Sequence, residues 1–283
     1  MSARSLKIIP LPKDWTQLKL KKTVVTAVLL LSLQPMAHAG CPFNVDDPGT
    51  DEPQHVVLNL AAVTSQVSGS ESDLFPSANF GYGLNNNFEV DLGSAIDSVR
   101  NSGSPRIFGY GDTTLYAKWR FLEETSKRPQ VALTGLVKFP TASRQRGLGS
   151  GYYDYIPALC LAKSFGRYFA CANAGYNILG DPGAISNTYY GLCVTYQATE
   201  LLTIGGQLYG SGSASPGTSG ELAYGLGLTY NYRPDQAFQL TIGRSARGLS
   251  DLNVYAGFQF DLGAVGGSRR SAPPATAAPT PAT

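Results

Sequence analysis

The sequence predicts an all-β protein: a transmembrane, antiparallel, up-and-down β-barrel of about 12 strands. Three observations support this fold class. The chain begins with a leader typical of exported proteins, its later segments alternate apolar and polar side chains with a period of two, and the polar side of that alternation is almost uncharged.

Residues 1–39 have the pattern of a signal peptide. A basic stretch at 19–22 precedes an apolar run at 23–33, and Ala37-His38-Ala39 places small residues at a cleavage site. The apolar run has eleven residues, whereas a membrane-spanning helix needs about 20. We therefore expect export through the Sec pathway. An alternative is a lipoprotein acylated at Cys41, although the residues before it lack the usual aliphatic side chain.

The charge of the chain changes once the leader is set aside. The full chain has 22 basic and 20 acidic residues, and the leader holds six of the basic residues and one of the acidic ones. The remainder has 16 basic and 19 acidic residues, a net charge of −3, so no electrostatic argument favours nucleic acid as a partner. An exported chain rich in Gly and Tyr is either an all-β globular protein or a membrane barrel.

The alternation distinguishes these two classes. In residues 168–177, Tyr and Ala occupy one face while Cys, Asn and Gly predominate on the other, and 188–198, 222–232, 236–245 and 252–262 follow the same rule. A soluble sandwich or barrel, the alternative reading, would expose Lys and Glu on its polar face. Here the polar face carries small uncharged residues and the apolar face has Tyr near the strand ends, which favours a lipid-facing barrel with a polar interior.

Twelve strands are predicted, with connections that alternate in length. They cover 55–63, 77–84, 87–93, 112–122, 130–139, 152–163, 168–177, 188–198, 201–211, 220–232, 235–245 and 251–262. Tight turns at 85–87, 164–167, 199–200 and 233–234 alternate with mostly longer loops at 64–76, 94–111, 140–151, 178–187 and 212–219. Short periplasmic turns and long external loops are typical of outer-membrane barrels.

The segments that flank the barrel differ from it in composition. Residues 55–262 form the predicted barrel, and residues 40–54 form an N-terminal periplasmic segment for which two positions stay open, inside the pore or free in the periplasm. Residues 263–283 are rich in Ala, Pro and Thr, and we expect a disordered tail. Tyr255–Leu262 resembles the C-terminal signal of outer-membrane proteins, which makes the barrel-assembly machinery an expected partner beside outer-membrane lipid.

Three cysteines fall on the inward parity of neighbouring strands. Cys160 and Cys171 are about equally far from the turn at 165–166, and Cys171 and Cys193 are equally far from Pro182. We expect Cys160, Cys171 and Cys193 to form a row at one level of the wall. In an oxidising compartment any pair among them is a candidate disulfide. No His or acidic residue is expected at that level, so no metal site is predicted.

Charged residues of the inward parity gather at one rim. Asp112, Lys138 and Asp154 lie at the external ends of three successive strands, and Lys118 and Arg120 continue along the first of them. One reading is structural, since inward charges need partners. The other is a constriction that orients a polar or anionic group. The full set of expected lumen residues is Asp112, Tyr116, Lys118, Arg120, Lys138, Asp154, Asn173, Gln207 and Tyr209.

Enzymatic function is not expected. A barrel phospholipase needs a His–Ser–Asn/Asp arrangement, and His55 is the only histidine after the leader. The sequence has no G-x-S-x-G motif, metal-ligand spacing or phosphate loop, so no catalytic residue and no cofactor is predicted.

Three segments resemble an outer-membrane barrel family named for a MetA pathway of phenol degradation. They are GDTTLYAKWRF at 111–121, GLVKFPT at 135–141 and GSGYYD at 149–154, in the family's order; Ala142 stands where the family usually has Gly. The resemblance spans roughly residues 75 to 262. It implies a barrel that handles small, often aromatic, compounds.

Two functions follow from these observations. The leading hypothesis is a narrow passive channel for small-molecule solutes in the bacterial outer membrane, since about 12 strands leave a slim lumen. The alternative is a non-conducting structural or surface-interaction barrel whose longer loops bind partners.

Overall fold

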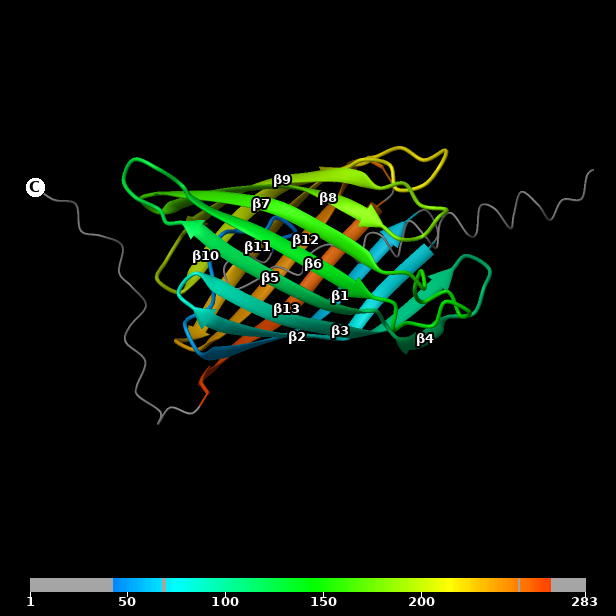
Figure 1. Ribbon diagram of the computed structural model, residues 1–283, viewed down its shortest axis with the longest axis horizontal. Helices are drawn as coiled ribbons and strands as arrows, with labels where there is room; N and C mark the ends of the chain where they lie inside the picture. The colour runs from blue at the N-terminus through cyan, green and yellow to red at the C-terminus, as the bar shows by residue number, and fades with distance from the viewer. Residues whose placement is uncertain (1–42, 68–69, 249, 266–283) are drawn as a thin grey trace, which may run out of the picture.

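A computed structural model, which describes residues 43–67, 70–248 and 250–265, has the chain folded into a closed antiparallel barrel of 12 strands with one further short strand at a rim (Figure 1). The predicted fold class is confirmed. The strands are β1 (His55–Val67), β2 (Ser70–Asn85), β3 (Phe88–Asn101), β4 (Ile107–Tyr110), β5 (Thr113–Leu122), β6 (Gln130–Phe139), β7 (Asp154–Phe165), β8 (Tyr168–Leu179), β9 (Asn187–Gln197), β10 (Leu202–Ser211), β11 (Glu221–Arg233), β12 (Gln236–Arg247) and β13 (Ser250–Ala264).

The leader 1–39, Cys41 and residues 266–283 of the predicted tail lie outside the described residues. In the part of the chain that the structure describes, no helix has the length and hydrophobicity to cross a membrane.

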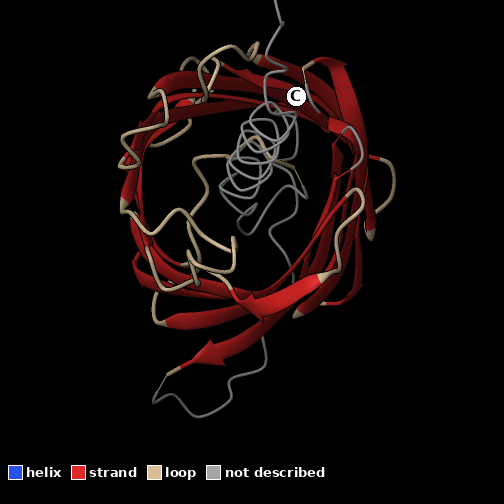
Figure 2. Ribbon diagram, turned by 90° about the vertical axis from the view of Figure 1, so that its right-hand side faces the viewer, coloured by secondary structure: helices blue, strands red, loops and turns tan. Residues whose placement is uncertain are grey.

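Hydrogen bonding closes the ring. Strands adjacent in sequence pair with each other, except that β5 pairs with β3 because the short β4 lies beside β3 outside the ring. The ring is closed by β1 and β13, which pair from His55↔Ala264 to Val67↔Ser250. Viewed along its axis, the molecule is a ring of strands with loop segments crossing its interior (Figure 2). Closure leaves none of the 12 strands with an unpaired edge, which matters in lipid because no water is present to satisfy exposed backbone groups.

The two ends of the barrel differ, as the alternating connections predict. The turn end, defined here as the end that holds 86–87, 123–129, 166–167, 198–201 and 234–235, has short connections. The loop end, at the opposite rim, has longer ones such as 140–153 and 212–220.

Two predicted loops at the loop end are largely strand. Most of 64–76 belongs to β1 and β2, and most of 94–111 belongs to β3 and β4. The outward face of this extension carries ion pairs: Arg100 and Arg106 both contact Glu71, and Arg106 also contacts Asp73. Polar and apolar residues are mixed on both faces of this extension, so the sequence there lacks the regular apolar alternation by which the other strands are recognised.

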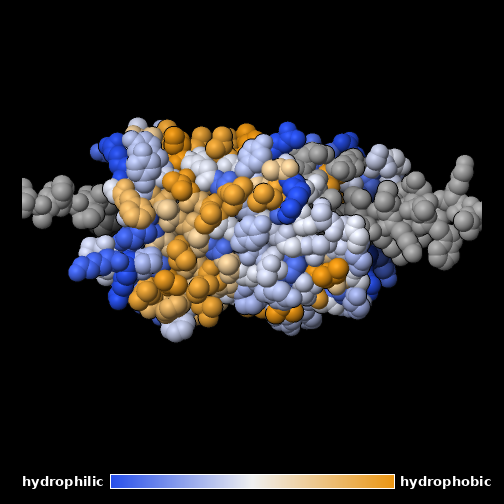
Figure 3. All heavy atoms as spheres, turned by 90° about the horizontal axis from the view of Figure 1, so that it is seen from above, coloured by the Kyte–Doolittle hydropathy of each residue, from blue (hydrophilic) through white to orange (hydrophobic). Residues whose placement is uncertain are grey.

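The outward face is apolar in a band. Apolar side chains gather over the half of the barrel nearer the turn end, and the loop end is more polar (Figure 3). Near the turn end the ring pairs Trp119–Phe121, Tyr168–Tyr196 and Phe238–Phe258 have centroids 5.6, 4.9 and 5.3 Å apart. An apolar band bordered by aromatic rings is the outer surface of a membrane barrel.

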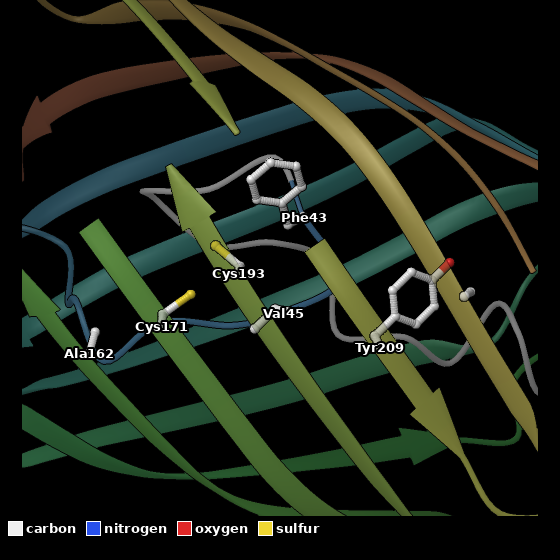
Figure 4. Packing of buried hydrophobic residues seen from close by; sticks show 7 residues of the cluster. Phe43, Val45, Ala162, Cys171, Cys193 and Tyr209 are labelled. Carbon is white, nitrogen blue, oxygen red and sulfur yellow. The ribbon is translucent and has the colours of Figure 1, made fainter. Parts of the chain in front are cut away.

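The cysteine row requires one correction. Cys171 on β8 lies directly opposite Cys193 on β9, and both are buried on the inner side of the wall next to Val45 (Figure 4). Cys160, however, lies opposite Asn173, and the residue opposite Cys171 on β7 is Ala162. The expected facing of Cys160 and Cys171 is wrong because the β7–β8 turn is centred between residues 166 and 167, with Phe165 paired to Tyr168.

An arginine on the outward face should destabilise the barrel. Leu226 is 72% exposed on the outer face of β11, between the outward residues Tyr224 and Tyr230. We expect Leu226→Arg to lower the free energy of unfolding in lipid vesicles by about 2–4 kcal/mol, because a charge at the middle of a bilayer is costly. Leu226→Ala, which adds no charge, is the control and should cost clearly less. Equal unfolding free energies for the two variants would contradict a lipid-facing position.

Oxidation should distinguish the three thiols. We expect mild oxidation of the folded barrel to join Cys171 to Cys193 and not to Cys160. Directly opposite residues fall within the Cα separation of a disulfide, whereas diagonal neighbours lie about 7–8 Å apart. Peptide mapping by mass spectrometry without reduction measures this, with Cys171→Ser as control; a Cys160–Cys171 peptide would contradict the register.

Candidate functional site: the barrel lumen

A segment of the chain itself occupies the turn-end half of the lumen. Residues 43–53, here called the lumen segment, precede β1, and Phe43, Val45, Asp46 and Asp47 are buried. Gln54 joins the segment to β1 with a φ of 65°, the left-handed conformation that reverses the chain at this point. Of the two positions left open by the sequence for this N-terminal segment, the described part takes the one inside the barrel.

The first half of the lumen segment is held by apolar contacts. Phe43 and Val45 pack in one buried cluster with wall residues, which are Ala162, Cys171, Cys193, Tyr209 and Ala223 (Figure 4). Glycines on the inner wall make room for them. A Cβ at Gly191 would lie 2.6 Å from Val45 Cγ2, and one at Gly227 would lie 2.7 Å from Phe43 Cε1. Glycine at these positions is therefore explained by the close approach of the segment.

The second half of the lumen segment is held by ion pairs and hydrogen bonds. Lys118 on β5 is 1% exposed, and its ammonium lies 3.1 Å from Asp46 Oδ1 and 3.3 Å from Glu89 Oε1. It also donates to the carbonyl of Gly49 at 2.9 Å. The Tyr116 hydroxyl donates to Asp46 Oδ2. The backbone amide of Asp51 donates to Glu89 Oε2 at 2.7 Å. Hydrogen bonds and ion pairs thus connect the segment to β3 and β5.

A second charged group lies at the loop end, where the sequence placed it. Lys138 Nζ lies 3.1 Å from Asp112 Oδ2 and 2.9 Å from Asp154 Oδ2, and it donates to Ser150 Oγ at 2.7 Å. Asp112 also accepts from the amide of Ala142 at 2.9 Å. The three residues predicted to share a rim are therefore in contact. They fix the connection 140–153 at the barrel mouth.

The remaining predicted lumen residues are spread along the wall. Gln207 accepts from the amide of Asn44 at 2.9 Å, and the hydroxyl of Tyr209 accepts from Asn253 at 3.3 Å. Asn173 is buried on β8. Arg120 lies at the turn end, where it donates to the carbonyl of Asn86. These four residues do not converge on one point.

Sequence reasoning missed the contribution of the lumen segment. Asp46, Asp47 and Asp51 are buried against the wall, but their segment has no periodicity that would predict a partner. Tyr189 was also missed, although its inward parity on β9 could have identified it; it packs with Tyr116, Leu136, Ile156 and Ala158. Within the described ranges, no three His, Cys, Asp or Glu side chains are grouped so that they could hold a metal ion.

His55 contacts carboxylates at the start of β1, which fits a structural role. Its Nδ1 hydrogen-bonds the carboxylate of Asp261 on β13 at 2.8 Å, and its Nε2 lies 3.5 Å from Glu52. The contact with Asp261 spans the β1–β13 pairing that closes the ring.

Several solved structures share the fold. The chain superimposes on a COG4313 outer membrane channel from Pseudomonas putida F1 with a TM-score of 0.64 at 11% identity, covering 76% of this chain and 98% of that one. The NanC porin matches with a TM-score of 0.54 at 13% identity, covering 72% of this chain and 100% of the porin. The KdgM porin matches with a TM-score of 0.50 at 13% identity, covering 71% and 98%. At these identities the likeness concerns the fold.

No curated protein matches the chain. A family model does: the one described as "Putative MetA-pathway of phenol degradation" matches residues 46–261. The match includes all three motifs of the 111–154 region and most of the lumen segment. The chain therefore belongs to this family of outer-membrane β-barrels.

Proposed function

We propose that the protein is a passive channel for small molecules in the bacterial outer membrane, reached through Sec export and cleavage of residues 1–39. The observation that carries the proposal is the polar character of the inner wall. Buried residues of the wall include Lys118, Lys138, Asn173, Gln207 and Gln239, so the barrel is not filled by a packed apolar core of its own. A polar lumen inside an apolar band provides a route for solutes.

The position of the lumen segment determines whether solutes can pass through the barrel. The segment is held to the wall by side-chain contacts, and among the described residues the β-bridge outside the named strands joins only its last residue, Pro53, to Gly83. Its withdrawal would leave the strand ladders intact. We propose that solutes pass when this segment moves out of the turn-end half of the lumen.

The remaining elements of the proposal concern placement. The turn end is assigned to the periplasm, because short connections lie there in outer-membrane barrels. β13, which contains Tyr255–Leu262, is the proposed contact for the barrel-assembly machinery. The solutes are proposed to be small and to include aromatic compounds, in keeping with the pathway for which the family is named.

A non-conducting interaction barrel is the second candidate. The observation that favours it is the extension of β1–β4 at the loop end, which carries ion pairs on its outward face. Shortening the 102–106 turn distinguishes the two functions, since a surface-interaction barrel should lose partner binding while a channel should keep its conductance. Deletion of 94–111 would be unsuitable, because that range contains more than half of β3 and all of β4.

Removing the lumen segment should increase passage. We expect a variant lacking residues 43–52 to show higher single-channel conductance in planar bilayers and faster solute uptake in liposome swelling than the wild type. Gly191→Val should act in the same direction, because its side chain would occupy the position of Val45. The matched control is Gly135→Val, since a Cβ at Gly135 meets no atom within 4 Å. If folded wild type and both lumen variants conduct no ions and admit no solute, the channel proposal is wrong.

A further inference from the structure

We propose that Lys118 and Tyr116 form a carboxylate-binding site in the lumen wall, that Asp46 fills this site in the closed barrel, and that the solutes of the channel are small organic acids that take its place. The inference rests on the proposed channel function and names the chemical class of its substrate.

The geometry around Asp46 is that of a bound carboxylate. One oxygen, Oδ1, lies 3.1 Å from the Lys118 ammonium, and the other, Oδ2, accepts from the Tyr116 hydroxyl. The thiol of Cys160 lies 3.9 Å from the same Oδ2. All four residues are at most 4% exposed. The carboxylate is thus held by an ion pair to one oxygen and by a charge-assisted hydrogen bond from a hydroxyl to the other.

The site belongs to the wall. Tyr116 and Lys118 are alternate inward residues of β5, and the β3 residues opposite them are Asp91 and Glu89. The strand ladder therefore holds both donors in place whether or not the lumen segment is present. Among the described residues, the Lys118 ammonium contacts Asp46 and the carbonyl of Gly49, which belong to the segment, and Glu89, which belongs to the wall.

The donors left by the segment select a carboxylate as the replacement. When the segment leaves, the ammonium of Lys118 retains Glu89 and loses its other two partners. A buried ammonium with unsatisfied donors is unfavourable, so a ligand that restores both the contacts and the charge is preferred. A monocarboxylate restores the charge that Asp46 supplied, whereas a neutral amide of the same shape does not.

The residues next to the carboxylate site favour a ligand whose remaining part is apolar. Tyr116 packs with Leu136, Ile156, Ala158 and Tyr189, and this cluster lies on the inner wall beside the carboxylate site. A ligand that places its carboxylate on Lys118 can place an apolar or aromatic ring against this cluster. Benzoate combines both features, and benzamide differs from it by lacking the charge.

Calorimetric titration of the full-length barrel with benzoate and with benzamide tests the site. We expect Asp46→Asn to tighten benzoate binding by about tenfold or more, because the competing carboxylate is weakened, and to leave benzamide unchanged. Adding Lys118→Met to Asp46→Asn should abolish the gain. Adding Tyr116→Phe instead should reduce the gain, and this variant keeps the test valid if Lys118→Met does not fold. The control is Glu221→Gln, a lumen carboxylate on β11 that contacts Ser245 and should leave benzoate affinity unchanged.

The possible outcomes separate this inference from the channel proposal. Equal gains for benzoate and benzamide in Asp46→Asn, or benzoate binding that persists without Lys118, would overturn the carboxylate site. Conductance of the barrel with no benzoate binding would also overturn it, while leaving the channel function in place. Selective benzoate binding by a barrel that never conducts would support the site and refute the channel.

Discussion

Backbone hydrogen bonding in lipid is the constraint on which the rest of this structure depends. Strand groups inside a bilayer have no water to pair with, so the 12 strands close into a ring through the β1–β13 pairing. Closure gives every strand one face toward lipid and one toward the lumen. The two-residue alternation of the sequence follows from it, as does the narrow interior in which a short peptide segment can reach opposite walls.

Charged side chains buried in a narrow interior are unfavourable unless they are paired, and the charged residues of this lumen form ion pairs. Lys138 contacts two aspartates at the loop end, and Lys118 contacts Asp46 and Glu89 in the turn-end half. The two groups differ in origin. The partners of Lys138 are residues adjoining the same wall, so that group fixes the mouth. One partner of Lys118 comes from the lumen segment, so that group links the wall to a part that the ladder does not hold.

Sequence periodicity could predict which side chains face the lumen, because this depends only on their parity along a strand. It could predict little about the register between strands or about segments without regular secondary structure. It placed Asp112, Lys138 and Asp154 together because three consecutive strands and their inward faces follow from alternation alone. It misjudged Cys160 against Cys171 because a shift of the turn centre by one residue displaces the partner by two. It could not place Asp46, since the lumen segment has no alternation and its contacts with Tyr116 and Gln207 lie far along the chain.

The lumen segment and the barrel are stabilised by different kinds of interaction, and this difference connects the fold to the proposed function. The barrel is a continuous ladder, whose opening would expose backbone groups to lipid. The segment is bound as a ligand is bound: Phe43 and Val45 fill an apolar site bordered by glycines, and Asp46 fills a polar one. Such contacts are exchangeable, because another molecule with an apolar body and a carboxylate can make them. In the proposed channel, the contacts that hold the lumen segment are therefore also the recognition elements for a solute of the same chemistry.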